Sequence, residues 1–186
     1  MAVRLLTARA FALYRVSLSF LAATAFFTGS TLISAVAAAE AADDPAYADQ
    51  TFSVNGLEKN AEIVVDHWGV PHIYAGTHYD AFFVQGFNAA RDRLWQIDLW
   101  RRKGLGLLSE VLGSDFVEKD RAARLLLYRG DMYPEWLAYG SDAKKIAESF
   151  TAGINAYVDL TSAQPELLPP EFTLLDYAPA RWLAED

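Results

Sequence analysis

The sequence contains no cysteine, and this absence excludes several kinds of site. The chain can form no disulfide, no Cys-ligated metal site and no thiol nucleophile. Histidine is also scarce, with only His67, His72 and His78, and their spacings fit neither the i, i+4 pair of a helical zinc site nor a loop signature. We therefore expect no metal site in this chain, and we expect His72 to hold a turn by bonding to the backbone.

Positive charge is in short supply. The 186 residues include 16 Lys and Arg against 24 Asp and Glu, which gives a formal net charge of −8. Binding to nucleic acid needs clustered Lys and Arg that displace counterions, so no nucleic-acid partner is expected. Hydrophobic residues make up 53% and aromatic residues 13%, which is ample for a packed core and far from a disordered composition.

The N-terminal segment has the parts of a secretory signal peptide. The first 15 residues carry three arginines and no acid, and residues 16–39 carry no charge and end in small side chains. A basic head, an apolar middle and an Ala-x-Ala exit are typical of such signals. We predict a signal peptide over residues 1–39 and a periplasmic or secreted protein. The small-residue rule allows cleavage after Ala37, Ala39 or Ala41.

A membrane anchor is the alternative for the same segment, since the uncharged run 16–39 is long enough to span a bilayer. Small and polar residues dilute its second half, however, and the strongly apolar part covers only about residues 18–27. The cleaved signal is therefore favoured, and no stable membrane association is expected after cleavage. Removal of residues 1–39 leaves 13 basic and 24 acidic residues, a formal net charge of −11.

Short strands are expected after a flexible leader. Residues 40–60 begin acidic and rich in alanine, and we expect them to form this leader. The β-branched runs 61–66 and 70–75 are typical of strands, and Gly69 and Pro71 punctuate them, so that two strands or one bent strand is predicted. Because Pro71 has no N–H to give to a ladder, it favours a sheet edge or the start of a strand.

Apolar residues at steps of three and four predict several helices after the strands. Thr77 and Asp80 resemble a capping box that opens the first helix, and Gly104 is expected just beyond its basic last turn, 101–103. The further expected elements are a helical turn over 107–112, a helix over 116–128 with Val117, Ala123, Leu126 and Leu127 on its apolar face, a helix opened by Ser141 and Asp142, irregular proline-rich backbone over 164–180, and the first turn of another helix over 182–186.

Two charged pairs on the first helix are candidates for a substrate clamp, namely Asp92–Arg93 and Arg101–Arg102. The i, i+4 spacing of Asp98 and Arg102 favours a different interpretation, in which these residues form ion pairs that tie the helix to its neighbours. Arginine networks commonly serve packing and orientation. We therefore interpret these charges as structural.

No serine has the sequence surroundings of a nucleophile, because the chain contains no G-x-S-x-G elbow. Ser109, Ser114 and Ser141 are interpreted as helix-surface or capping serines. We nominate no catalytic, substrate-binding or metal-binding residue in this chain.

Several blocks together resemble the N-terminal-nucleophile hydrolases of the penicillin acylase family. The resemblance covers about residues 62–186, and the expected domain is the family's α-chain portion, 61–186, incomplete at its C-terminus. The blocks, in order, are Asp66-x-x-Gly69-Val70-Pro71-His72-Ile73-x-Ala75, Gln85-Gly86-Phe87, Asp92-Arg93-Leu94-Trp95-Gln96, Arg101-Arg102, Ser109-Glu110-Val111-Leu112-Gly113, Gly153-Ile154-Asn155-Ala156-Tyr157 and Leu168-Pro169-Pro170-Glu171-Phe172.

The resemblance implies an α+β fold, the N-terminal part of a four-layer αββα sandwich with short strands followed by several helices. It also implies an exported precursor that cuts itself. A serine then begins the β chain and attacks a linear amide with its own α-amino group as the base. Substrates of this kind include β-lactam side chains and N-acyl homoserine lactones. The β chain of the same precursor would be the partner of this α chain.

By the same resemblance, the nucleophile belongs to a β chain that this sequence does not contain. The chain alone is therefore expected to be inactive and to need no cofactor. The family's calcium ligands fall outside the matching region, which leaves calcium binding by a full-length protein open. The alternative function is an exported, non-catalytic binding or interaction module with the α-chain fold.

Overall fold

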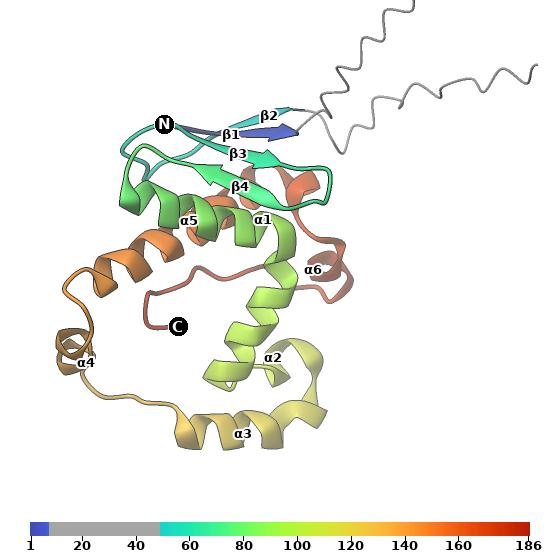
Figure 1. Ribbon diagram of the computed structural model, residues 1–186. Helices are drawn as coiled ribbons and strands as arrows, with labels where there is room; N and C mark the ends of the chain where they lie inside the picture. The colour runs from blue at the N-terminus through green and yellow to red at the C-terminus, as the bar shows by residue number, and fades with distance from the viewer. Residues whose placement is uncertain (8–48) are drawn as a thin grey trace, which may run out of the picture.

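The computed structural model describes residues 1–7 and 49–186 (Figure 1). A four-stranded mixed sheet lies over the helices α1 and α5, and the second half of α1 with α2 and α3 extends away from it. The strands, in the sheet order β2-β1-β3-β4, are β2 (Gln50–Ser53), β1 (Ala2–Thr7), β3 (Ala61–Val65) and β4 (Pro71–Tyr74). The helices are α1 (His78–Leu105), α2 (Ser109–Leu112), α3 (Val117–Leu126), α4 (Tyr133–Ala138), α5 (Ala143–Ala163) and α6 (Pro170–Leu174), with 3-10 turns at Ser114–Phe116 and Pro165–Leu167. The predicted α+β class, short strands followed by several helices, is confirmed.

The hairpin of β3 and β4 agrees with the sequence. The two strands pair antiparallel, with Ile63 opposite Ile73 and Val65 opposite Pro71. Pro71 is the first residue of β4, which lies at an edge of the sheet. Proline, which has no N–H, is tolerated at the first residue of a strand and on an edge strand, and Pro71 meets both conditions.

The prediction of a flexible leader over 40–60 is wrong for the part that the structure describes. Residues 50–53 form β2, and three apolar side chains, Phe52, Val54 and Leu57, are buried in the core. The capping box also differs from the prediction. The Thr77 hydroxyl caps α1 by accepting the N–H of Asp80 at 3.1 Å, but the buried Asp80 carboxylate accepts the N–H groups of residues 58 and 59 at 2.8 and 3.2 Å. This carboxylate fastens the segment to α1.

The N-terminal residues also differ from the prediction. Residues 1–7 were assigned to the head of a signal peptide, but residues 2–7 form β1, an inner strand of the sheet. Residues 8–48, with the apolar run and the cleavage sites, lie outside the described residues, so signal cleavage stays a prediction. In the parts of the chain that the structure describes, none of the helices combines the length and the apolar character that a membrane span requires.

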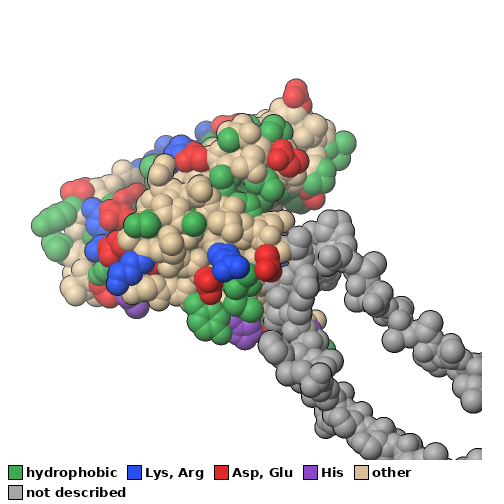
Figure 2. All heavy atoms as spheres, turned by 90° about the horizontal axis from the view of Figure 1, so that it is seen from above, with side chains coloured by type: hydrophobic (Ala, Val, Ile, Leu, Met, Phe, Trp, Pro, Cys, Tyr) green, Lys and Arg blue, Asp and Glu red, His purple; other side chains and the backbone are tan. Residues whose placement is uncertain are grey.

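The core lies between one face of the sheet and the helices α1 and α5. The Phe87 ring is central to it, with its centroid 5.5 Å from that of Phe52 on β2 and 5.4 Å from that of Tyr157 on α5. Such tilted and edge-to-face ring pairs add to the apolar area that is buried. The opposite face of the sheet exposes Glu62 and Tyr74. Seen from this end, basic side chains stand singly or in small groups among acidic ones (Figure 2).

Helices α1 and α5 cross in direct backbone contact. A methyl group on Gly86 of α1 would overlap the carbonyl oxygen of Phe150, and a methyl group on Gly153 of α5 would overlap that of Phe83. The two glycines therefore allow a reciprocal approach that no larger residue permits. This contact explains why both helices place glycine in their interiors, where it otherwise costs helix stability.

Helix α1 is longer than predicted and is not straight. It runs past residues 101–103 to Leu105, and its C-cap is Gly106, with a left-handed φ of 67°, rather than Gly104. The Gly106 carbonyl accepts the Nε–H of Arg124 at 2.8 Å, which joins the end of α1 to α3. Arg93 has non-helical backbone angles and marks a kink between the half that lies against the sheet and the half that leaves it.

Two further predictions need correction. Helix α3 forms within the predicted range, but its apolar side chains are not buried: Leu125 and Leu126 are 82% and 89% exposed. The irregular backbone predicted over 164–180 is wrong at Pro165 and Pro170, which start short helices because the fixed φ of proline suits a first helical turn. Pro169 and Pro179 lie outside helices, as predicted. The end of the chain forms a turn, closed by the Asp186 N–H to the Leu183 carbonyl, and not the helix predicted there.

Replacing Gly153 by alanine is expected to destabilise the protein by about 1–3 kcal/mol, the usual cost of overpacking, because the two helix backbones must separate. Gly104 supplies the control, since it lies inside the partner helix α1 and a methyl group there meets no atom within 4 Å. Gly104→Ala should stabilise by roughly 0.5–1 kcal/mol through helix propensity. Urea unfolding followed by circular dichroism measures the unfolding free energy of both variants. Equal changes in the two variants would contradict the backbone contact between α1 and α5.

Acid should weaken the junction of α2 and α3. The Asp120 carboxylate accepts the N–H groups of Leu108 and Ser109 at 2.9 and 2.7 Å. Burial raises the pKa of Asp120, but these hydrogen bonds outweigh it, and the net pKa lies below the ordinary 3.8. The stabilising effect is therefore complete above pH 3.8 and is lost as the pH falls through the lower folded pKa.

We expect Asp120→Asn to be less stable than the parent at pH 7, and the difference in unfolding free energy to narrow steadily below pH 4. Denaturant unfolding at a series of pH values tests this. A difference that stays constant down to pH 2 would show that the charge of Asp120 has no part in the junction.

Candidate functional site

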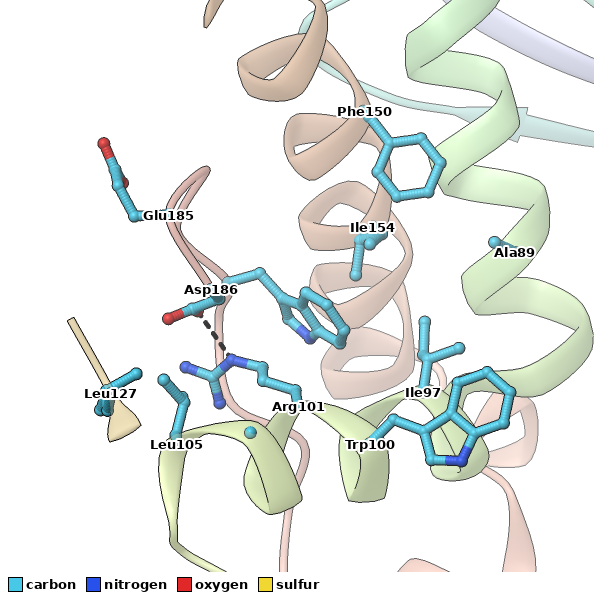
Figure 3. A pocket seen from close by; sticks show the side chains of 12 residues that line it. Ala89, Ile97, Trp100, Arg101, Leu105, Leu127, Phe150, Ile154, Glu185 and Asp186 are labelled. Atoms are coloured by element: carbon cyan, nitrogen blue, oxygen red, sulfur yellow. Dashed lines mark hydrogen bonds and ion pairs between the residues drawn. The ribbon is translucent and has the colours of Figure 1, made fainter. Parts of the chain in front are cut away.

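An apolar hollow of about 440 Å³ lies between the second half of α1, helix α5 and the C-terminal segment 181–186 (Figure 3). Phe150 and Ile154 reach it from α5, and Ile97 and Trp100 from α1. Arg101 and Asp186 provide its main polar groups. Its volume falls in the range of small-ligand pockets, and its lining is that of a site for an apolar group.

Arg101 attaches the C-terminal segment to this hollow. Its Nε–H donates to Asp186 Oδ2 at 2.7 Å, and its Nη2 donates to the Arg181 carbonyl at 3.3 Å. The guanidinium also lies over the Trp182 ring, 5.6 Å from the centroid. Because its charge is paired with Asp186, Arg101 positions the wall of the hollow rather than offering a free cation to a substrate.

Arg102 lies in a second, buried network. Its Nε is 2.8 Å from Asp98 Oδ2 and its Nη1 is 3.1 Å from Glu110 Oε2, which joins α1 to α2. The guanidinium also faces the Tyr177 ring at 5.0 Å. Burial, followed by the negative charge of Asp98, raises the pKa of Tyr177 to about 12. The predicted i, i+4 pair of Asp98 and Arg102 is confirmed, and its role is structural.

The Asp92–Arg93 pair is not a clamp. Asp92 Oδ1 is 2.7 Å from Nη2 of Arg91, and its Oδ2 accepts from the Asn88 amide at 3.1 Å. Arg93 donates instead to the Gln96 side chain at 3.2 Å. Both side chains bond to neighbours on their own helix, in agreement with the structural interpretation.

The histidines do not come together. His72 lies 3.1 Å from Asp66 Oδ2, and Asp66 Oδ1 accepts the N–H groups of Trp68 and Val70 at 2.9 Å each. The hydrogen bond from His72, followed by that from Val70, lowers the pKa of Asp66. The prediction that His72 itself bonds to the turn backbone is wrong, because the carboxylate does so and the imidazole holds the carboxylate.

The other two histidine rings lie against aromatic neighbours, His67 on Trp68 and His78 on Phe82. Within residues 1–7 and 49–186, no cluster of three or more His, Asp or Glu side chains could hold a metal ion.

The three serines considered from the sequence lie apart from these histidines. Ser109 begins α2, and its N–H donates to Asp120. Ser114 begins a 3-10 turn, and Ser141 is exposed before α5, whose N-cap Asp142 makes no side-chain capping bond. Among the hydrogen bonds of the described residues, none joins a serine hydroxyl to a histidine.

Comparison with known proteins gives one consistent result. The sequence profile of the penicillin amidase family matches residues 60–186. Penicillin G acylase of Escherichia coli is 34% identical over 139 residues, 74% of this chain, and penicillin acylase 2 proenzyme of Pseudomonas sp. (strain SE83) is 38% identical over 132 residues, 71% of this chain. Acyl-homoserine lactone acylase QuiP of Pseudomonas syringae pv. tomato is 31% identical over 139 residues, 75% of this chain.

A solved structure of thermostable penicillin G acylase from Alcaligenes faecalis superposes with a TM-score of 0.62 at 32% identity, covering 67% of this chain and 66% of that one. This chain spans only 16% of the length of each of the three curated relatives. The profile match and these identities agree with the order of motifs and with the α+β architecture. The chain belongs to the penicillin amidase family and has part of its N-terminal-nucleophile hydrolase fold.

Proposed function

We propose that this chain is the α-chain part of an exported amidohydrolase that cleaves linear amides, with its nucleophilic serine on a β chain of the same precursor. The observation that carries the proposal is the combination of a family match over residues 60–186 with a coverage of 16% of the relatives. Relatives are named as acylases of penicillin and of acyl-homoserine lactones, so these two classes of amide are the proposed substrates.

The described residues support a scaffolding role for this chain. Arg101 and Arg102, the candidate clamp, are paired with carboxylates of the protein, and no serine among the described residues is hydrogen-bonded to a histidine. This agrees with a nucleophile on another chain, since a weak hydroxyl nucleophile needs an adjacent base. The bare apolar side chains of α3 and α4 support the proposed partner. Leu126 and Leu137 are 89% and 67% exposed, as expected of a surface that another chain covers.

The hollow beside α5 fits the same proposal. It is apolar, and its polar groups are mainly Arg101 and Asp186, which bond to each other. An acyl group would find hydrophobic contact there, beside the paired Arg101 and Asp186 and the exposed Glu185. We propose that the hollow contributes to the pocket for the acyl group once the β chain is in place.

The purified 186-residue chain should release no detectable amine from penicillins or N-acyl homoserine lactones, because it lacks the proposed nucleophile. The precursor encoded by the complete reading frame should hydrolyse at least one of them. A fluorogenic amine assay on both proteins provides the measurement. Hydrolysis by the short chain alone at an enzymatic rate would refute the proposal. Binding of these amides without hydrolysis by either protein would favour the non-catalytic binding module.

In the active precursor, Ser109→Ala, Ser114→Ala and Ser141→Ala should each leave kcat unchanged, because these serines begin or precede helices and none is hydrogen-bonded to a histidine. Burst kinetics with a chromogenic amide gives kcat together with the amount of acyl-enzyme. If one variant loses both while its fold is kept, the nucleophile lies in this chain and its assignment to a β chain is wrong.

A further inference from the structure

The N-terminal strand β1 is held on both sides. It pairs antiparallel with β2, with Val3 opposite Phe52, and parallel with β3, with Val3 next to Ala61 and Leu5 next to Ile63. The N–H of residue 54 donates to the carbonyl of residue 1 at 2.9 Å, which extends the ladder beyond the strand itself. An inner strand with two ladders satisfies its backbone on both edges, as the middle strands of a sheet do.

The side chains of β1 match the two faces of the sheet. Val3 is fully buried in the core, and Leu5 packs against it from the same face. Arg4 points to the open face, where its neighbour in the parallel register is the exposed Glu62. A strand with apolar residues inward and a cation beside this acid therefore fits the position, and a strand shifted by one residue does not.

The connection between β1 and β2 does not dictate this pairing. Residues 8–49 separate the two strands, whereas antiparallel neighbours are normally joined by two to five residues. Among the described strands, β2 has β1 as its one ladder partner. Without β1, a gap one strand wide would remain between β2 and β3, with the edges of both strands open.

We propose that this gap is a binding slot for an extended peptide strand, and that residues 2–7 fill it as a built-in ligand while the N-terminal segment remains attached. The slot takes an extended segment that runs parallel to β3 and carries apolar side chains at alternate positions. Covalent attachment makes binding of the segment intramolecular, and cutting the connection removes this advantage. Cleavage within the segment would then empty the slot.

Two glutamine variants of the full chain test whether residues 2–7 occupy the slot or serve only as part of a signal peptide. Val3→Gln places a polar group in the core and should increase amide hydrogen exchange in 50–53 and 61–65 at least tenfold. Arg4→Gln introduces the same residue on the open face and should leave that exchange at the parental level. Exchange in α5, measured by mass spectrometry in the same samples, reports whether the rest of the fold is kept.

Equal protection of β2 and β3 in the parent and in Val3→Gln would overturn the proposal. An equal loss in Val3→Gln and Arg4→Gln would do the same, since the effect would not depend on the buried face. If Val3→Gln does not fold, Val3→Ala removes two buried methyl groups without adding a polar group, and it should give a smaller loss of protection in the same two strands.

Cleavage of the folded chain tests the exchange of the ligand. A specific protease site inserted after Ala41 allows the segment to be cut off after purification. We expect it to separate on gel filtration, and protection of β2 and β3 to fall. A synthetic peptide of residues 1–7 should restore protection in proportion to its concentration, whereas the same peptide with Val3→Gln should not. Unchanged protection after removal of the segment, or no rescue by the parental peptide, would refute the slot. These outcomes do not depend on amide hydrolysis, so they are independent of the proposed function.

Discussion

The backbone contact between α1 and α5 is the constraint on which the other packing depends. Because Gly86 and Gly153 each face a carbonyl of the other helix, the two axes can approach closely enough for one layer of aromatic rings to fill the space beneath the sheet. Ile63 and Phe52 then cover that layer from the sheet side. Close-packed interiors tolerate little change in such spacings. The two glycines therefore fix the distance between α1 and α5 on which the packing of the core rests.

Side chains, rather than backbone contact, organise the part of the molecule farther from the sheet. Arg101 and Arg102 are successive residues of α1, yet they serve different neighbours: the first holds the C-terminal segment and the second holds α2. Asp120 adds a third attachment by capping the start of α2 from α3. These attachments depend on paired charges and not on a close approach of backbones. A buried charge without a partner is costly, so each charge needs its partner in place.

Much of the fold could be predicted from the sequence where the signal is local. The β3–β4 hairpin follows from its β-branched runs and from Pro71, and the start of α1 follows from the Thr77 cap. The pair of Asp98 and Arg102 follows from helical spacing, and the family from the order of the motifs.

The features that were missed depend on distant partners. β1 and β2 exist because they complete each other's ladders across residues 8–49, and no pattern within either segment reveals this. The end of α1 is decided at Gly106 rather than Gly104 by contact with α3, which lies beyond it in the chain. The hollow was not predicted because its walls, such as Trp100 and Asp186, are far apart in sequence, and Arg101 alone indicates neither partner.

The irregular residue Arg93 has a mechanical consequence. Upstream of it, α1 is locked into the core by the crossing with α5, and downstream the same helix carries Trp100 and Arg101 along the hollow. A sharp change in helix direction is localised where the backbone leaves helical geometry. The direction of the downstream half, and with it the place of Trp100 and Arg101 beside the hollow, is therefore set by two torsion angles at a single residue.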